Sequence, residues 1–184
     1  MSGKNKKGLY IQLYSIHGLI RHDKPEYGRD ADTGGQVKYV LELANELSND
    51  PLIEKVDLVT RLIKDKNVSE DYSVPEEKVN EKFSIIRVKA GGGKYIRKEL
   101  LWDHLEEFVD KSIKYIKSLG RLPDVIHSHY ADAGYVCSEL TKFFGIPFIH
   151  TGHSLGRSKL GKLLSDGLNR EEIEKRYKIS HRID

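Results

Sequence analysis

Residues 33–36 combine the signature of a helix start with two adjacent glycines. Thr33 and Gln36 have the spacing of a capping box, in which both side chains satisfy free N–H groups of the first helical turn. Capping alone does not require Gly34 and Gly35, and a glycine inside a helix costs about 1 kcal/mol relative to alanine. A bare backbone at a helix N-terminus lets a phosphate or a sugar hydroxyl approach the N–H groups. We therefore expect ligand contact here, with a purely structural cap as the alternative.

Residues 91–94 form a second glycine-rich segment that ends in a lysine. Tyr95 follows Lys94, so the segment lacks the serine or threonine of a nucleotide-triphosphatase phosphate loop. The dinucleotide fingerprint GxGxxG occurs nowhere in the chain. Two interpretations stay open, a flexible turn and an anion contact by Lys94 above a sheet.

Several histidines have spacings that could bring them together. His127 and His129 would share one face of a strand, and three further candidates follow in the chain: Asp132, His150 and His153. Zinc sites use such ligands, but this spacing is loose, so we expect no metal. The pattern favours a polar pocket in which Tyr130 and a carboxylate bind hydroxyl groups.

Residues 152–156 match the nucleophile elbow GxSxG of serine hydrolases, with Ser154 at its centre. That mechanism needs an acid and then a histidine later in the chain. The only later histidine is His181, and no further strand is predicted to carry the acid. The sequence therefore argues against a hydrolase. Lys159 follows closely enough to face the same pocket, and Arg182 could reach it from a second helix that begins near residue 169.

The elements that must position these residues alternate between strand and helix. Apolar runs predict strands at 9–14, 56–60, 83–88, 124–128 and 146–150. Helical spacing covers 37–47, 98–119 and 133–144 and continues from the last strand to the end, while the polar stretch 64–81 is expected to be a surface excursion. This alternation predicts an α/β fold with a Rossmann-like, doubly wound, mostly parallel sheet. Ligands bind such sheets beyond the carboxyl ends of the strands, which are followed here by residues 28–36, 91–94, 129–134 and 151–159.

Composition places the chain among ordinary globular proteins. It has 184 residues, 38% of them hydrophobic, and a net charge of only +3, which does not call for nucleic acid or a membrane surface as partner. The single cysteine, Cys137, excludes an internal disulfide. The basic opening, residues 1–7, lacks the features of a signal peptide, so a cytoplasmic location is expected.

Together these segments resemble sucrose-phosphate synthases, a family of retaining glycosyltransferases (family 4) with the two-domain GT-B architecture. The matching stretches are residues 17–21, 28–40, 98–102, 123–127, 129–134, 151–156, 177–179 and 182–183. Sucrose synthases share residues 32–36 but lack the pattern at 152–156 and Lys159, so they rank second.

The resemblance implies transfer of glucose from UDP-glucose to fructose 6-phosphate, which gives sucrose 6-phosphate and UDP, without a cofactor or a metal. The family binds the acceptor in its N-terminal domain and the nucleotide sugar mainly in its C-terminal domain. By resemblance, Gly34, Gly35 and Gln36 line the acceptor and approach the donor diphosphate. The 6-phosphate would be held by Lys94, Lys159 and Arg182. Tyr130, His153 and Ser154 would contact the sugars near the transfer centre, with no protein nucleophile.

Members of this family are much longer than this chain. Residues 1–184 are therefore expected to be an acceptor-binding N-terminal domain, itself incomplete, and UDP-glucose would be bound with a C-terminal domain that is absent here. Two alternatives stay open, a fragment of sucrose synthase or another family-4 enzyme and a sugar-phosphate-binding module without catalytic activity.

Overall fold

The computed structural model describes residues 8–183, and its centre is a six-stranded sheet with strand order β3-β4-β2-β1-β5-β6. The strands are β1 (Leu9–Tyr14), β2 (Ile53–Arg61), β3 (Glu76–Lys78), β4 (Phe83–Val88), β5 (Val125–His129) and β6 (Phe148–Thr151). All neighbours pair in parallel except β3, which runs antiparallel to β4. The predicted α/β fold is confirmed. The basic opening, residues 1–7, lies outside the described residues.

Helices cover both faces of the sheet, and a separate group follows the last strand. The α-helices are α1 (Gly35–Asn49), α2 (Leu105–Ser118), α3 (Ala131–Phe144), α4 (Gly156–Ser165) and α5 (Arg170–Tyr177). Short 3₁₀ turns are η1 (Glu70–Ser73), η2 (Lys98–Leu100), η3 (Trp102–His104) and η4 (Ile179–Arg182). None of the helices within residues 8–183 is long and apolar enough to cross a membrane.

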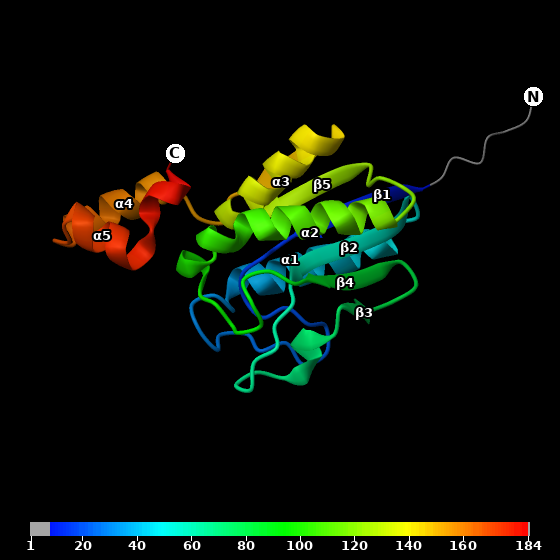
Figure 1. The fold of residues 1–184 in the computed structure, drawn as a ribbon, viewed down its shortest axis with the longest axis horizontal. Coiled ribbons are helices and arrows are strands. Elements are labelled where there is room, and N and C mark those ends of the chain that lie inside the picture. Colours follow the sequence, from blue (N-terminus) through cyan, green and yellow to red (C-terminus); the bar gives the residue numbers. More distant parts are fainter. Residues whose placement is uncertain (1–7, 184) are drawn as a thin grey trace, which may run out of the picture.

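The sheet separates two apolar cores. One face packs against α1 through buried side chains such as Val37, Val40 and Leu41, and the other packs against α2 and α3 through Phe108 and Val136. Figure 1 shows α1 on one side of the sheet and α2 with α3 on the other. This two-sided burial explains why the central strands are nearly continuous apolar runs.

Most elements lie within a few residues of their expected bounds, and two larger differences remain. The helix expected from residue 98 begins only at Leu105, because residues 98–104 form the turns η2 and η3. Short β3 lies inside the polar stretch 64–81 and extends the sheet at β4, although its sequence is too polar to predict a strand. The first difference matters for function, since Lys98 and Trp102 project from turns instead of a helix face.

The helices α4 and α5 and the turn η4 form a C-terminal helical unit, residues 156–182. Figure 1 shows this unit beside the carboxyl ends of the parallel strands, away from both covered faces of the sheet. Within it, Asn169 and Glu172 form a capping box at the start of α5. Glu174 accepts hydrogen bonds from the Ser180 backbone N–H at 3.0 Å and hydroxyl at 2.7 Å, which ties η4 to α5.

Candidate functional site

The start of α1 lies at the carboxyl rim of the sheet, but its cap is not the expected one. The N-cap residue is Gly34, and no side chain caps the helix. The Thr33 hydroxyl instead accepts from the Asp30 N–H and donates to the Asp30 carbonyl, which turns it back into the preceding loop. The Gln36 amide donates to the His129 carbonyl of β5 at 3.3 Å. The capping-box interpretation of Thr33 and Gln36 is therefore wrong.

Nothing in the surrounding protein requires glycine at positions 34 and 35. A Cβ atom built on Gly34 or Gly35 would meet no heavy atom within 4 Å. Neither residue has a positive φ angle, unlike Gly28 at φ 74° in the loop before them. The two glycines thus leave bare backbone at the N-terminus of α1, where free N–H groups and the helix dipole favour an anion or a hydroxyl.

Tyr130 starts α3 at a strained φ of 78°. The charges of Arg182 and Lys98 act on its hydroxyl, and those of the same two side chains act on Lys159. Arg182, from η4, donates to the Tyr130 hydroxyl at 2.7 Å. Lys159, from α4, lies 4.8 Å from the centre of the Tyr177 ring, and burial together with the charges of Arg182 and Lys98 lowers its pKa. We call Lys98, Lys159 and Arg182 the cation cluster.

Lys98 belongs to this cluster and was not predicted as a site residue. Its backbone N–H donates to Asp32 at 2.9 Å, and its ammonium group pairs with the same carboxylate and lies 3.4 Å from Glu99. Burial opposes the charge of Lys98, but the bonds to Asp32 outweigh it and raise the lysine pKa. Asp32 shifts the other way: burial would raise its pKa, but Lys98 keeps it below its ordinary value.

Lys94 lies in a different neighbourhood from the one expected. Its side chain is exposed, its charge acts on Asp65, and its backbone carbonyl accepts from Arg61 at 2.7 Å. Lys98, four residues after Lys94 in the chain, is the lysine that the turn η2 brings next to Asp32. Sequence reasoning missed Lys98 because a helix was expected from this residue onward, and a helix face gives no reason to single it out.

His153 follows β6 with a positive φ of 55° and lies at the same rim. Its Nε2 is 3.0 Å from Nδ1 of His129, and Tyr39 packs edge-on against the His153 ring at a centroid distance of 5.1 Å. Burial, reinforced by the neighbouring histidines, lowers the pKa of His129 to about 3 and also lowers that of His153. Both rings are therefore neutral at pH 7.

The neutral pair has one favoured proton arrangement. The His129 Nε2 atom is buried without a hydrogen-bond partner among residues 8–183. An unpartnered buried N–H is costlier than an unpartnered lone pair, so the His129 proton belongs on Nδ1, where it is donated to His153. His153 then carries its own proton on Nδ1, which makes this exposed ring a hydrogen-bond donor suited to a sugar oxygen.

A buried ion pair that sequence reasoning missed lies beneath Tyr130. His17, from the loop after β1, donates to Asp132 at 2.7 Å, and both side chains are at most 5% exposed. The His17 ring packs edge-on against Tyr130 at a centroid distance of 4.7 Å. Burial alone would lower the pKa of His17, but the Asp132 carboxylate raises it. We had expected Asp132 to face the pocket. It instead pairs with His17.

The metal site and the serine hydrolase receive no support from the geometry of the described residues. Within residues 8–183, no group of three or more histidine, cysteine or acidic side chains is arranged to hold a metal. Ser154 is exposed, and no histidine in that part of the chain forms a hydrogen bond to its hydroxyl. His181, the only later histidine, stacks on Trp102.

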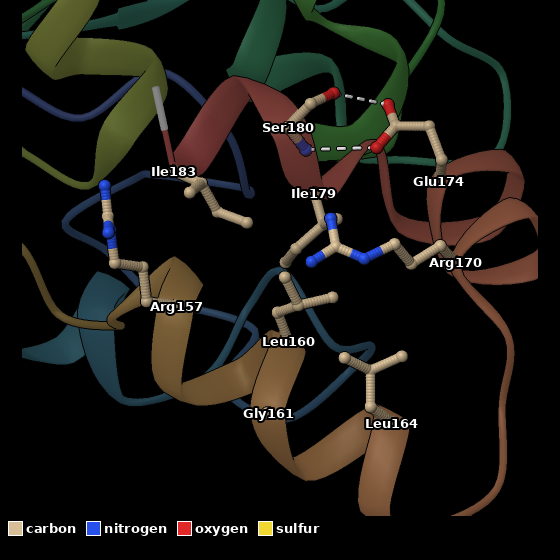
Figure 2. Close-up of a pocket in the computed structure, with 9 residues that line it drawn as sticks. All are labelled: Arg157, Leu160, Gly161, Leu164, Arg170, Glu174, Ile179, Ser180 and Ile183. Carbon is tan, nitrogen blue, oxygen red and sulfur yellow. Dashed lines mark hydrogen bonds between the residues drawn. The ribbon is translucent and has the colours of Figure 1, made fainter.

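A separate hollow of about 520 Å³ lies inside the C-terminal helical unit (Figure 2). Its apolar lining comes from α4, η4 and the residue after η4: Leu160, Leu164, Ile179 and Ile183. Arg157 and Arg170 flank it. None of the predicted site residues lines this hollow, so we place the candidate site at the sheet rim.

Comparisons with known proteins agree with the fold. Residues 7–183 match the family described as sucrose synthase first GT-B domain. Sucrose-phosphate synthase 4 of Arabidopsis thaliana is 44% identical over 98% of this chain and 19% of its own length, and the spinach (Spinacia oleracea) sucrose-phosphate synthase is 42% identical over 97% of this chain and 20% of its own.

Among solved structures, a sucrose-phosphate synthase from Thermosynechococcus elongatus superposes with a TM-score of 0.69 at 25% identity, covering 94% of this chain and 38% of that one. The chain spans about a fifth of the length of the curated relatives. The resemblance to sucrose-phosphate synthases is confirmed, and the chain belongs to the family of sucrose synthase first GT-B domains.

Proposed function

We propose that this chain is the acceptor-binding half of a sucrose-phosphate synthase-like enzyme, which transfers glucose from UDP-glucose to fructose 6-phosphate. The observation that carries the proposal is the cation cluster, in which η2, α4 and η4 each supply one positive charge and Lys159 feels the charges of the other two. Phosphate recognition favours charge-assisted bonds from lysine and arginine. A sugar phosphate is therefore the ligand class that best fits this part of the rim.

The other rim residues suit the sugar and the donor. The open backbone at Gly34 and Gly35 leaves room for the acceptor and for the donor diphosphate, and the Gln36 side chain is held between β5 and the loop after β1. His153 and Ser154, both exposed on the loop after β6, would contact sugar hydroxyls. In this proposal the chain binds and orients, and none of its side chains acts as a nucleophile.

Lys98 replaces Lys94 in the proposed phosphate site. Lys98 shares the electrostatic environment of Lys159, whereas Lys94 acts on Asp65. The donor UDP-glucose would be held mainly by a second domain, as expected for a GT-B architecture. The enzyme as a whole would work in the cytoplasm and need no cofactor from this half.

Calorimetric titration of the chain with fructose 6-phosphate and with free fructose tests the proposal. Lys159→Ala should weaken binding of the phosphorylated sugar by about 1.5–3 kcal/mol, the usual range for hydrogen bonds to charged groups, and leave fructose nearly unaffected. Lys162→Ala, three residues further on the same helix and exposed, is the matched control and should change neither. An equal loss for both sugars would contradict the assignment.

The rival function, a sugar-phosphate-binding module without catalysis, predicts the same binding but a different outcome with a partner. When a domain that binds UDP-glucose is supplied in trans, the enzyme half should give UDP release that depends on fructose 6-phosphate. Binding without turnover under those conditions would favour the module.

A further inference from the structure

We propose that Trp102 and His181 are positioning residues for the cation cluster, and that their ring stack fixes Lys159 and Arg182 relative to Lys98. The inference rests on the proposed phosphate site and adds two aromatic residues that are not members of the cation cluster. The rings of Trp102 and His181 are stacked with centroids 4.6 Å apart and an interplanar angle of 11°. Trp102 lies in η3, within the sheet and its covering helices (residues 8–151), which we call the sheet domain, and His181 belongs to the C-terminal helical unit.

The stack joins the two segments that supply the cations. Lys98 lies only four residues before Trp102, in the consecutive turns η2 and η3. On the other side, Arg182 directly follows His181 in η4. Any slip of one ring over the other would therefore shift Arg182 relative to Lys98 by a similar amount.

Lys159 is coupled to the same stack through the backbone. Gly156, at the start of α4, approaches η4 so closely that a Cβ atom there would lie 2.3 Å from the Arg182 carbonyl oxygen. Lys159 lies three residues beyond Gly156 on that helix. The start of α4 and the end of η4 are thus in direct backbone contact and move together.

The rest of the helical unit reinforces this coupling. Figure 2 shows the Glu174 carboxylate, on α5, holding both the backbone N–H and the hydroxyl of Ser180, the residue before His181. The hydrogen bond from Arg182 to Tyr130 is the second defined contact with the sheet domain. Arg182 also donates to the Tyr177 carbonyl at the end of α5. Both ends of η4 are therefore tied to α5, and the ring stack and the bond to Tyr130 hold this joined unit to the rest of the chain.

Trp102 is the only tryptophan in the chain, so its fluorescence reports directly on the stack. Iodide quenching of Trp102 and the ¹H–¹⁵N signal of the Arg182 side-chain Nε–H both measure positioning without a ligand. Calorimetric titration with fructose 6-phosphate measures how this positioning affects the affinity for the ligand. Unfolding temperature is followed in parallel, because a merely structural role would lower it in every variant that loses binding.

The expected result is selective. His181→Ala should increase iodide quenching, move the Arg182 Nε–H signal toward that of a free arginine and weaken fructose 6-phosphate binding about three- to tenfold, the range for one aromatic pair. His181→Phe should restore all three, because the ring and not the charge makes the contact. His22→Ala, a histidine exposed on the loop after β1, is the matched control and should change none.

Two results would overturn the inference. In the first, His181→Ala leaves the Arg182 signal and the affinity unchanged. In the second, His181→Phe binds as weakly as His181→Ala although both keep the wild-type unfolding temperature. A wild-type chain that fails to bind fructose 6-phosphate would refute the proposed function instead, and the Arg182 signal would still decide whether the stack positions the cluster.

Discussion

Replacing Gly35 by alanine separates the structural and functional roles of the bare helix start. Gly35 is the first residue of α1, has no positive φ angle, and an added Cβ would touch no protein atom within 4 Å. The substitution should therefore stabilise the chain by about 0.4–1 kcal/mol, because alanine loses less backbone entropy on folding. For a chain of this size that corresponds to an increase of about 1–4 °C in Tm.

The same methyl group should interfere with the ligand. If a sugar or phosphate packs against the backbone at Gly35, the added atom overpacks that contact by about 1–3 kcal/mol, which weakens binding roughly 5- to 150-fold. Thermal unfolding and calorimetric titration of one preparation with fructose 6-phosphate measure both effects. Greater stability together with weaker binding is an outcome that damage to the fold cannot produce.

Gly161→Ala is the matched control for Gly35→Ala. Gly161 is also a helical glycine whose added Cβ would meet open space, and it lies in α4 outside the rim site. It should raise Tm similarly without changing the affinity. If Gly35→Ala binds fructose 6-phosphate as tightly as the Gly161 variant does, the bare backbone at Gly35 has no role in binding and the reasoning fails.

Two predictions concern buried histidines and are read from urea unfolding at several pH values. Because Asp132 raises the pKa of folded His17, the pair stabilises the native state fully below about pH 6.5, and this contribution is lost as the pH rises through the folded pKa. His17→Gln should have a lower free energy of unfolding than the wild type at pH 6, and it should lose less of it between pH 6 and pH 9. A variant with the wild-type pH profile would contradict the ion pair. The pKa of His129 is lowered to about 3, so its unfolded form takes up a proton that the native form does not, and stability should fall with a slope of about 1.4 kcal/mol per pH unit from pH 6 down to pH 4. His129→Asn should remove that part of the slope, and a variant that keeps it would show that another group is responsible.

The sequence predicted the sheet well because its strands are buried on both faces. The boundaries of β1 and β4 match the predicted ones, since continuous apolar runs end sharply at polar loops. Short β3 could not be predicted, because its three residues are charged and only the free edge of β4 makes them a strand. Local pattern therefore determines the centre of the sheet, and tertiary context determines its edge.

Site residues that belong to a local motif could be predicted from the sequence. Site residues that come together from distant segments could not. The open glycines at residues 34 and 35 follow from composition and helix propensity alone. The choice of Lys98 over Lys94 depends on the turns η2 and η3, and on Asp32, which is 66 residues away in the chain. The pairing of His17 with Asp132 joins residues 115 positions apart, which no spacing rule indicates.

Asp32 has two opposing effects on the cation cluster, and these yield one further prediction. Its carboxylate orients Lys98 and offsets the cost of burying it, but it also neutralises charge that a phosphate would use. Asp32→Asn keeps an oxygen that can accept from the Lys98 backbone N–H while removing the negative charge. Fructose 6-phosphate should then bind at least about 1 kcal/mol more tightly, or roughly fivefold in Kd, since two unit charges 4 Å apart interact by about that much even in bulk water and by more where Asp32 is buried.

The gain from Asp32→Asn should shrink as salt is added, because it is electrostatic, but only in part, because Asp32 is 5% exposed and buried charges are screened less than exposed ones. Titrations at low and high ionic strength measure this, and free fructose serves as the ligand without charge. Weaker binding of both sugars would mean that orienting Lys98 is the dominant effect of Asp32. Weaker binding of the phosphorylated sugar alone would show that the Asp32 carboxylate is needed to place Lys98 against the phosphate. The negative charge of Asp32 would then be a structural requirement of the site and would not compete with the ligand.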